Sequence, residues 1–333
     1  MFSICYVLVD DENLKYYHEL LISAYSVRYR GYTGVITVLT DQQTNNCLIE
    51  NGSKEYEELD LKLVIVDVPA GLSIKEISRY IKTGCREYVQ GDMLFLDTDT
   101  IAVRELPEEV STGEIAFALD EHWPRIGGSS ETVMPEKSAE AKKRRIVKCG
   151  YEYDSDNPYY NSGCIWSRDT EFTHRFFREW REEWNKCRLL GVVFDQVSLF
   201  YLTTKYSQQV CELNGIWNVS VCAPQGMKYL ENAIIIHYWN QGCSVYRLSD
   251  SEVQKKGYRS EEVRDIIANP LSAFYPSKIV RAESSIESDF QTTSTYLETI
   301  DLYKNRFQFF RCINFLFSLR GKIRHMRSKK KTK

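Results

Sequence analysis

The alternation of short apolar runs with helical patterns is the feature of this sequence that most constrains its fold. Three runs, at residues 4–9, 35–40 and 61–68, are nearly continuous in apolar residues, and a fourth lies at 93–96. Strands without a polar side are typical of a parallel sheet that is covered on both faces. Helically spaced apolar residues follow the first run and precede the fourth. The sequence therefore predicts an α/β fold with an open, mostly parallel sheet flanked by helices.

The second half of the chain has weaker patterns. Residues 114–120 favour a further strand, whereas the polar stretch 124–150, rich in Gly, Ser and Lys, favours a loop or lid. In the helical pattern at 170–190, aromatic residues recur at four-residue steps, which predicts a buried helix face rather than a sugar platform. The last part of the chain is mostly helical. We therefore expect an α/β domain at residues 1–248 and a helical C-terminal extension at 249–333.

Composition is typical of a globular protein. Hydrophobic residues make up 43% of the 333 residues and charged residues 27%. The first residues have no basic leader and resemble a strand rather than a signal peptide, which predicts cytoplasmic residence. The ten cysteines contain no CxxC pair, so we expect reduced thiols and neither disulfides nor a zinc cluster.

The end of the chain is strongly basic. Residues 302–333 hold 11 Lys or Arg and no acidic residue, which leaves 32 basic and 46 acidic residues in the rest. One helical face of this tail would be apolar, with Phe309, Phe310, Ile313, Leu316 and Phe317. The apolar stretch is interrupted too often to span a bilayer. We predict that residues 305–333 lie on an anionic membrane surface. The alternative is a helix packed on the α/β domain and followed by a basic end.

Two carboxylates follow the fourth apolar run. Asp97 and Asp99 are separated by one residue in FLDTDTIAV, so one or both can face a cavity at the end of the strand. Carboxylates repel a diphosphate, but a divalent cation between them reverses the sign of the interaction. Oxygen ligands suit Mg²⁺ or Mn²⁺. The pair therefore predicts a metal site for a diphosphate ligand, and the alternative is a plain turn that joins two strands.

Polar residues follow two other apolar runs. Val9, Asp10 and Asn13 lie between the first run and a helix, where a nucleotide can be bound. The alternative is that Asp11 or Asn13 caps that helix. His237 follows a late apolar run, and is either a satisfied histidine at a strand end or a nitrogen ligand that favours Mn²⁺ over Mg²⁺.

Five ordered segments resemble the retaining glycosyltransferases of family 8, which have the GT-A fold. They are VLVDDENLKYYHELLISAYSV, FLDTDTIAV, YYNSGCIWS, FDQVSLF and IIHYW, within residues 1–245. Five landmarks in order are more specific than a lone DxD. The resemblance implies a metal-dependent transfer of a hexose, with retention of configuration, from UDP-galactose or UDP-glucose to a glycan or glycolipid.

The resemblance also implies roles for matching residues of this chain. The implied metal ligands are Asp97, Asp99 and His237, with Mn²⁺ as the expected ion and Mg²⁺ as the alternative. The implied donor-binding residues are Val9, Asp10, Asn13, Arg79, Asp97, Thr98, Asn161, Ser162 and Gly163. The pair implied to lie beside the reacting sugar carbon is Asp195 and Gln196.

Each of these roles has a structural alternative. Arg79 can be a solvated helix residue, with Lys82 as a weaker substitute for its role; the segment at 161–163 can be a turn, and Asp195 can cap a helix. The chain also departs from the family after His237, because no lysine follows near Gly242. This departure leaves the contacts to the diphosphate open.

Two mechanisms and two other classes of protein stay open. Asp195 can act as the nucleophile of a double displacement, or the acceptor can attack from the same face beside Gln196. A sugar-phosphate nucleotidyltransferase would need a Gly-rich phosphate loop, which VDDENLKYYHE lacks. A non-catalytic protein that binds carbohydrate, or nucleic acid through the tail, is the other class. We expect no nucleic-acid partner, and the sequence does not set the oligomeric state.

Overall fold

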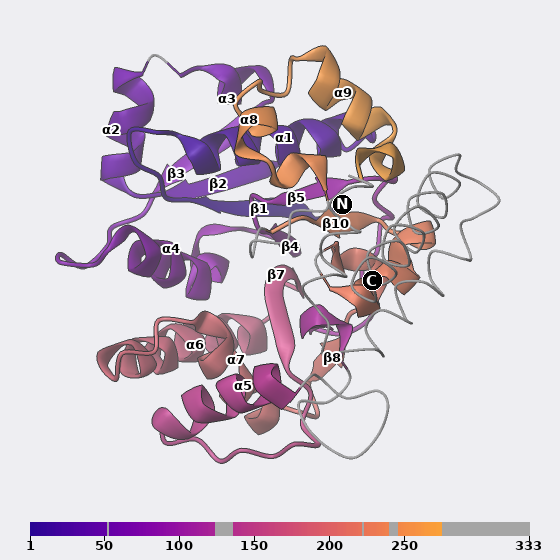
Figure 1. Cartoon of the computed structure of the whole chain (residues 1–333). Helices are drawn as coiled ribbons and strands as arrows, with labels where there is room; N and C mark the ends of the chain where they lie inside the picture. Colours follow the sequence, from indigo (N-terminus) through magenta and orange to yellow (C-terminus); the bar gives the residue numbers. More distant parts are fainter. Residues whose placement is uncertain (52, 124–135, 222, 240–245, 275–333) are drawn as a thin grey trace, which may run out of the picture.

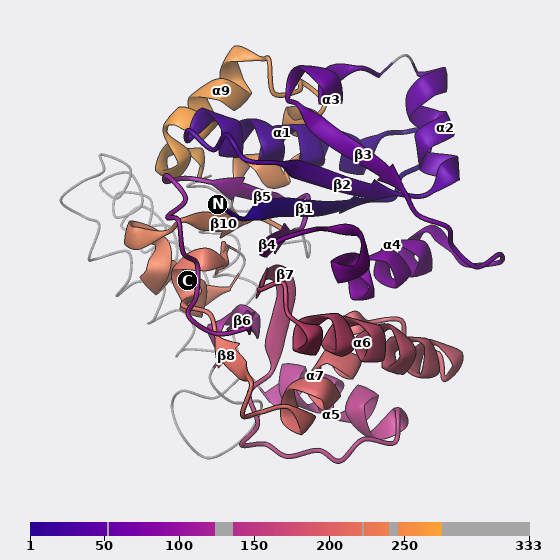
Figure 2. The same cartoon turned by 180° about the vertical axis from the view of Figure 1, so that it is seen from behind.

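A seven-stranded sheet separates two groups of helices (Figures 1 and 2). The computed structural model describes residues 1–51, 53–123, 136–221, 223–239 and 246–274. The strand order is β3-β2-β1-β4-β7-β6-β8. The strands span Ser3–Leu8 (β1), Ile36–Thr40 (β2), Leu61–Ile65 (β3), Met93–Leu96 (β4), Ile115–Leu119 (β6), Tyr160–Ser167 (β7) and Val210–Glu212 (β8).

Most neighbouring strands of this sheet run parallel. Strand β1 pairs with β2 and β4, so that Ile4 lies opposite Ile36 and Leu94. Strand β3 pairs with β2, and β8 with β6, also in parallel. Only β7 runs against its neighbours β4 and β6. The predicted open, mostly parallel α/β sheet is confirmed.

Alternate residues of β1 face two separate parts of the core, because successive side chains of a strand point to opposite faces. Ile4, Tyr6 and Leu8 pack on the side of α1 (Lys15–Tyr29). Cys5 and Val7 pack on the side of the second helix group. That group contains α4 (Ile74–Thr83), α6 (Glu171–Leu189) and α7 (Asp195–Lys205). Both faces of the strand are buried, as its unbroken apolar run predicts.

The aromatic stripe of α6 is part of the core, as predicted. Phe176, Trp180 and Trp184 are fully buried. The indole nitrogens of the two tryptophans donate to main-chain oxygens at the start of α7 and just before it, Trp180 to Asp195 at 3.2 Å and Trp184 to Val193 at 3.0 Å. The stripe therefore fixes the position of α7, which carries Asp195.

A small second sheet lies beside the acidic turn. Its order is β5-β10-β9, with β5 at Thr100–Ala102, β9 at Val219–Ser220 and β10 at Ile235–His237. Strand β10 runs antiparallel to β5, and His237 pairs with Thr100. This pairing brings a residue from late in the chain next to Asp99.

The expected loop at 124–150 is wrong for its second part, because residues Glu136–Lys148 form helix α5. Its sequence is polar but rich in Ala, Lys, Arg and Glu, which are good helix formers. Ala139 and Ile146, two turns apart, are buried against Val197 and Phe200 of α7. The segment is mostly polar, so these two apolar residues did not make a helical pattern evident in the sequence. Residues 124–135 lie outside the described part of the chain.

Helices after residue 248 pack on α1. Helix α8 (Ser251–Gln254) and helix α9 (Glu261–Ala268) share its core, and the rings of Tyr25 and Tyr258 are 5.3 Å apart. The boundary at 248/249 stays a prediction. Residues 275–333, including the basic tail, lie outside the described part of the chain. Among the described residues, no helix is long and apolar enough to cross a membrane.

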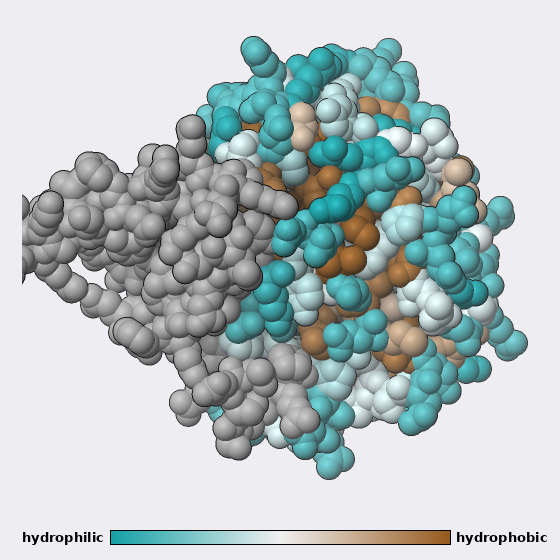
Figure 3. All heavy atoms as spheres, turned by 90° about the vertical axis from the view of Figure 1, so that its right-hand side faces the viewer, coloured by the Kyte–Doolittle hydropathy of each residue, from teal (hydrophilic) through white to brown (hydrophobic). Residues whose placement is uncertain are grey.

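The remaining elements are short. Helices α2 (Gln42–Glu50) and α3 (Glu55–Glu58) lie between β2 and β3. The 3₁₀ helices are Cys85–Tyr88 (η1), Asp120–His122 (η2), Gly215–Trp217 (η3), Pro224–Asn232 (η4), Arg247–Ser249 (η5) and Pro270–Ala273 (η6). On the face shown in Figure 3, hydrophobic side chains lie in small areas between hydrophilic ones, which is ordinary for a globular surface.

Candidate functional site

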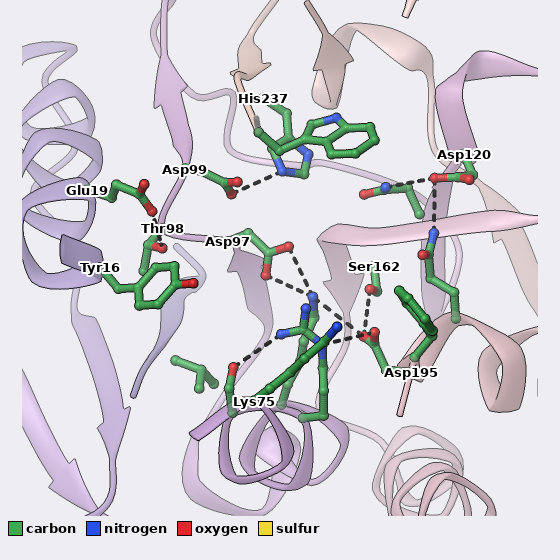
Figure 4. A pocket seen from close by; sticks show the side chains of 18 of the residues that line it. Tyr16, Glu19, Lys75, Asp97, Thr98, Asp99, Asp120, Ser162, Asp195 and His237 are labelled. Carbon is green, nitrogen blue, oxygen red and sulfur yellow. Dashed lines mark hydrogen bonds and ion pairs between the residues drawn. The ribbon is translucent and has the colours of Figure 1, made fainter. Parts of the chain in front are cut away.

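A cavity of about 1000 Å³ lies beyond the carboxyl ends of β1 and β4 (Figure 4). Open α/β sheets bind ligands at this edge, and the volume is that of a small-molecule site. The predicted residues that line it are Val9, Arg79, Asp97, Thr98, Asp99, Asn161, Ser162, Asp195, Gln196 and His237. Of the remaining predicted residues, Asp10, Asn13 and Gly163 do not line it.

Three predicted ligands meet on one wall of the cavity. One potential ligand atom from each of Asp97, Asp99 and His237 lies within 4.8 Å of the others. The His237 Nε2 lies 3.0 Å from Asp99 Oδ1. Two carboxylates and an imidazole fit Mn²⁺ better than Mg²⁺, because nitrogen ligands suit transition metals. The Asp-Thr-Asp segment joins two strands, as the alternative of a plain turn predicts. Both of its carboxylates also face the cavity, as a metal site requires.

Asp99 and His237 stabilise each other's charged forms. Burial alone would lower the pKa of His237, but the charge and hydrogen bond of Asp99 raise it. Burial would raise the pKa of Asp99, but the His237 charge outweighs it and the pKa falls. The carboxylate is therefore ionised and available to a cation.

Asn218 orients the imidazole, and sequence analysis missed it. Its Oδ1 lies 2.9 Å from His237 Nδ1, and its Nδ2 donates to Asn161 Oδ1 at 2.9 Å. With Nδ1–H donating to Asn218, Nε2 is the nitrogen that would bind a metal; without a metal, Nε2–H donates to Asp99 Oδ1. Such partners set the tautomer of metal-binding histidines. The residue precedes the two-residue strand β9, and no sequence pattern singles it out.

Gly163 leaves room for the same ring. A methyl group on its Cα would lie 2.8 Å from His237 Nδ1 and closer still to Cε1. The Gly163 carbonyl also accepts the Asp97 main-chain N–H at 2.8 Å. The segment 161–163 lies inside β7, so the alternative of a turn is wrong. Gly163 thus shapes the candidate metal site from behind without lining the cavity.

We expect Gly163→Ala to weaken Mn²⁺ binding by about 10- to 100-fold, because the added methyl displaces an imidazole that two hydrogen bonds hold in place. Titration calorimetry with MnCl₂ measures this. Gly113→Ala is the matched control, since its added methyl would meet the exposed Cys211 side chain far from the site. Equal Mn²⁺ affinity of the Gly163→Ala variant and the wild type would refute this role.

Helix α4 supplies the cations that neutralise Asp97 and Asp195. The helix begins with a capping box formed by Ser73 and Glu76. The Lys82 Nζ lies 2.8 Å and 3.1 Å from the two Asp97 oxygens and 3.6 Å from Asp195 Oδ2. The side chain of this lysine is only 2% exposed. Lys82, which was expected only as a weaker substitute for Arg79, is therefore the central cation of the site.

Asp195 is held on three sides. Arg79 Nε lies 3.2 Å from its Oδ1 as an ion pair, and Ser162 Oγ donates to its Oδ2 at 2.7 Å. Burial would raise the pKa of Asp195, but Lys82 and then Arg79 lower it, so the carboxylate is ionised. It is the first residue of α7, so it lies at a helix start as the alternative holds, but its carboxylate also pairs with Lys82 and Arg79. The alternative of a solvated Arg79 is wrong.

Asp120 is a second residue that sequence analysis missed. Its Oδ1 accepts hydrogen bonds from Asn161 Nδ2 at 2.9 Å and Gln196 Nε2 at 3.0 Å, and its Oδ2 pairs with Lys142 of α5. The next residue, Glu121, has a φ of 51°, a strained backbone conformation of a kind that clusters at functional sites. A signal existed, because Asp120 ends a predicted strand just as Asp97 does.

The acidic turn after β1 does not bring all its residues to the cavity. Val9 lines it, but the buried Asp10 carboxylate accepts the Tyr17 N–H of α1 at 2.7 Å. Asn13 is exposed and bonds to Asp11. The alternative that Asp11 or Asn13 caps the helix is wrong, since Asp10 fills that role. Burial raises the pKa of Asp10 to about 6.

Glu19 of α1 is a further buried carboxyl group in the cavity. Thr98 Oγ1 lies 3.4 Å from its Oε2, and Gln254 Nε2 donates to its Oε1 at 3.1 Å. Burial, and then the charge of Asp99, raise its pKa from 4.5 to about 7. A raised acid pKa stabilises the folded state below pH 4.5, and this stability is lost as pH rises through 7.

We therefore expect Glu19→Gln to remove a pH-dependent loss of stability. In EDTA, the free energy of unfolding of the wild type should fall relative to the variant by about 3 kcal/mol between about pH 5 and pH 8. Urea denaturation at both pH values measures it. The exposed Glu57→Gln variant should follow the wild type. A difference between Glu19→Gln and wild type that does not change with pH would contradict the assignment.

The sheet order, the helices on both faces and the cavity at the strand ends define a GT-A-type glycosyltransferase fold. A structure of the galactosyltransferase LgtC with donor and acceptor sugar analogues matches with a TM-score of 0.50, 17% identity, and coverage of 79% of this chain and 99% of that chain. An active-site mutant of LgtC matches with a TM-score of 0.50, 16% identity and the same coverage. The fold that the resemblance to family 8 implied is confirmed.

Sequence comparisons add nothing to this likeness of fold. No protein-family model matches the chain, and a search of curated proteins finds no match. Mouse xyloside xylosyltransferase 1 aligns with a TM-score of 0.44 and 12% identity over 73% of this chain and 98% of that chain. The comparisons therefore show the fold of this chain and not its activity.

Proposed function

We propose that this chain is a metal-dependent glycosyltransferase that transfers a hexose from UDP-galactose or UDP-glucose to a glycan or glycolipid with retention of configuration. The observation that supports it best is the meeting of Asp97, Asp99 and His237 in a cavity whose other wall carries an ionised Asp195. Asp97, Asp99 and His237 suit a metal-bound diphosphate. In this proposal, a sugar attached to that diphosphate would extend towards Asp195.

Mn²⁺ is the cation we propose, held by Asp97, Asp99 and His237, with Mg²⁺ as the alternative. A bound cation supplies Lewis-acid stabilisation of the charge that accumulates on the leaving nucleoside diphosphate, worth several kcal/mol. The chain's own residues bind and orient the donor. We assign its nucleotide to the side of Val9, its diphosphate to the Thr98 side, and its sugar to Ser162 and Asn161.

The contacts of Asp195 favour attack by the acceptor from the same face over a double displacement. Its carboxylate is paired with Lys82 and Arg79 and accepts a hydrogen bond from Ser162, so its negative charge is already neutralised. Such a group is a weak nucleophile. We propose that Asp195 positions Arg79 and Lys82, while the Gln196 amide, which Asp120 orients, contacts the reacting sugar.

Two measurements on the full chain test the proposal. With Mn²⁺, UDP-galactose or UDP-glucose should raise the melting temperature more than either component alone, because the ligand binds only the folded state. UDP should also be released slowly without an acceptor. A nucleotidyltransferase would instead form pyrophosphate from UTP and a sugar phosphate. Neither stabilisation nor UDP release with any nucleotide sugar would refute the proposal.

We also propose cytoplasmic residence, with residues 305–333 on an anionic membrane surface. The support is the excess of basic residues and the apolar face expected for that tail. Deleting residues 305–333 should shift the protein from the membrane fraction to the supernatant. Unchanged recovery with membranes would refute this part alone.

A further inference from the structure

Two basic side chains flank an aromatic ring in the cavity. Phe194 directly precedes helix α7, and its ring contacts both Lys75 of α4 and Arg145 of α5. The Lys75 Nζ is 4.5 Å, and the Arg145 guanidinium carbon 4.1 Å, from the centre of the ring. Both are cation–π distances. All three residues line the cavity.

These two cations differ from the others around the cavity because they have no carboxylate partner. Lys82 and Arg79 pair with Asp97 and Asp195, Lys142 pairs with Asp120, and Lys15 lies 3.9 Å from Glu19. Within the described ranges, neither Lys75 nor Arg145 forms an ion pair. Two positive charges therefore lie beside Phe194 without an ion-pair partner among the described residues.

The position of this pair separates it from the metal ligands. Phe194 is the neighbour of Asp195, and Figure 4 shows Lys75 and Asp195 on one side of Asp97, with His237 on the other. In the proposed function, a cation held at His237 neutralises the charge of the donor diphosphate. An anion beside Phe194 must then come from the other substrate, which approaches the sugar from the Asp195 side.

We propose that the acceptor carries an anionic group, a phosphate or a carboxylate, that binds between Lys75 and Arg145 while its sugar ring lies against Phe194. The inference rests on the proposed function. A guanidinium binds phosphate and carboxylate with two parallel hydrogen bonds, and the flexible lysine adds a point charge. The half-buried Arg145 comes from α5 and the exposed Lys75 from α4, so two separate helices bring a positive charge to the same ring.

Binding of simple sugars to the full chain tests this, with galactose 6-phosphate, galacturonic acid and galactose as probes. Titration calorimetry is done with and without Mn²⁺ and UDP. At least one charged probe should bind about tenfold or more tightly than galactose, because hydrogen bonds to charged groups exceed neutral ones. The double variant Lys75→Ala with Arg145→Ala should remove the preference. Arg144→Ala, an exposed neighbour on α5, is the matched control and should keep it.

The outcomes separate this inference from the proposed function. UDP should bind the double variant with Mn²⁺ as tightly as it binds the wild type, and if it binds neither, the proposed function fails. If UDP binding is intact and galactose binds as well as the charged probes, or the charged probes do not bind, the anionic acceptor is refuted alone. Loss of UDP affinity in the double variant would also overturn the inference, since the cations would then serve the donor.

Discussion

Replacing Asp99 with asparagine is expected to lower kcat/KM for sugar transfer by about 10³-fold. Asp99 is the carboxylate that lies 3.0 Å from His237 Nε2, and the two together keep each other charged. An amide cannot supply the negative charge that holds the proposed cation, and the diphosphate would then lie beside Asp97 with no metal ion between them. The rate of UDP release from the donor, with acceptor and saturating Mn²⁺, measures the loss.

Two controls distinguish lost metal binding from misfolding. Asp67→Asn removes the same charge from an exposed position and should leave the rate unchanged. The melting temperature of Asp99→Asn should no longer rise with Mn²⁺, while its far-UV circular dichroism stays that of the wild type. Full activity of Asp99→Asn at low Mn²⁺ would eliminate Asp99 as a ligand and leave the site without its second carboxylate.

Much of the fold followed from local patterns. The runs that became β1, β2 and β4 are apolar on both faces, and only a covered parallel sheet buries such strands. Because β4 ends at Leu96, Asp97 and Asp99 follow its carboxyl end, where ligands bind. The polar helix α5 was not predicted, because only two apolar residues, Ala139 and Ile146, mark its buried face.

Other parts of the site depend on contacts that no sequence pattern shows. Asn218 reaches His237 because β9 pairs with β10, a pairing between very short strands. Asp10, not its neighbours, caps α1, because Leu14 adopts a left-handed conformation with a φ of 51° and provides no side-chain cap. The contact of Asn218 with His237 and the capping of α1 by Asp10 both depend on tertiary geometry, which local propensity does not encode.

Lys82→Met is expected to destabilise the metal-free protein by about 3–5 kcal/mol. The lysine is buried between Asp97 and Asp195, and methionine fills similar space without the charge. Asp195 would keep Arg79 and Ser162, but its pKa should rise because the charge of Lys82, which lowers it most, is gone. Urea denaturation in EDTA measures the loss, and the exposed Lys143→Met is the control for loss of a lysine.

Mn²⁺ should reverse part of this loss, because the metal and the Lys82 ammonium compete for the same Asp97 oxygens. In the wild type a cation at Asp97 meets a positive charge 2.8 Å from its ligand atom, and this repulsion is absent in Lys82→Met. The variant should therefore bind Mn²⁺ about tenfold more tightly, and its melting temperature should rise more with Mn²⁺ than that of the wild type. Lys82→Arg keeps the charge and should show neither effect in full. Weaker Mn²⁺ binding by Lys82→Met than by the wild type would mean that Lys82 organises the metal site instead of competing with the metal.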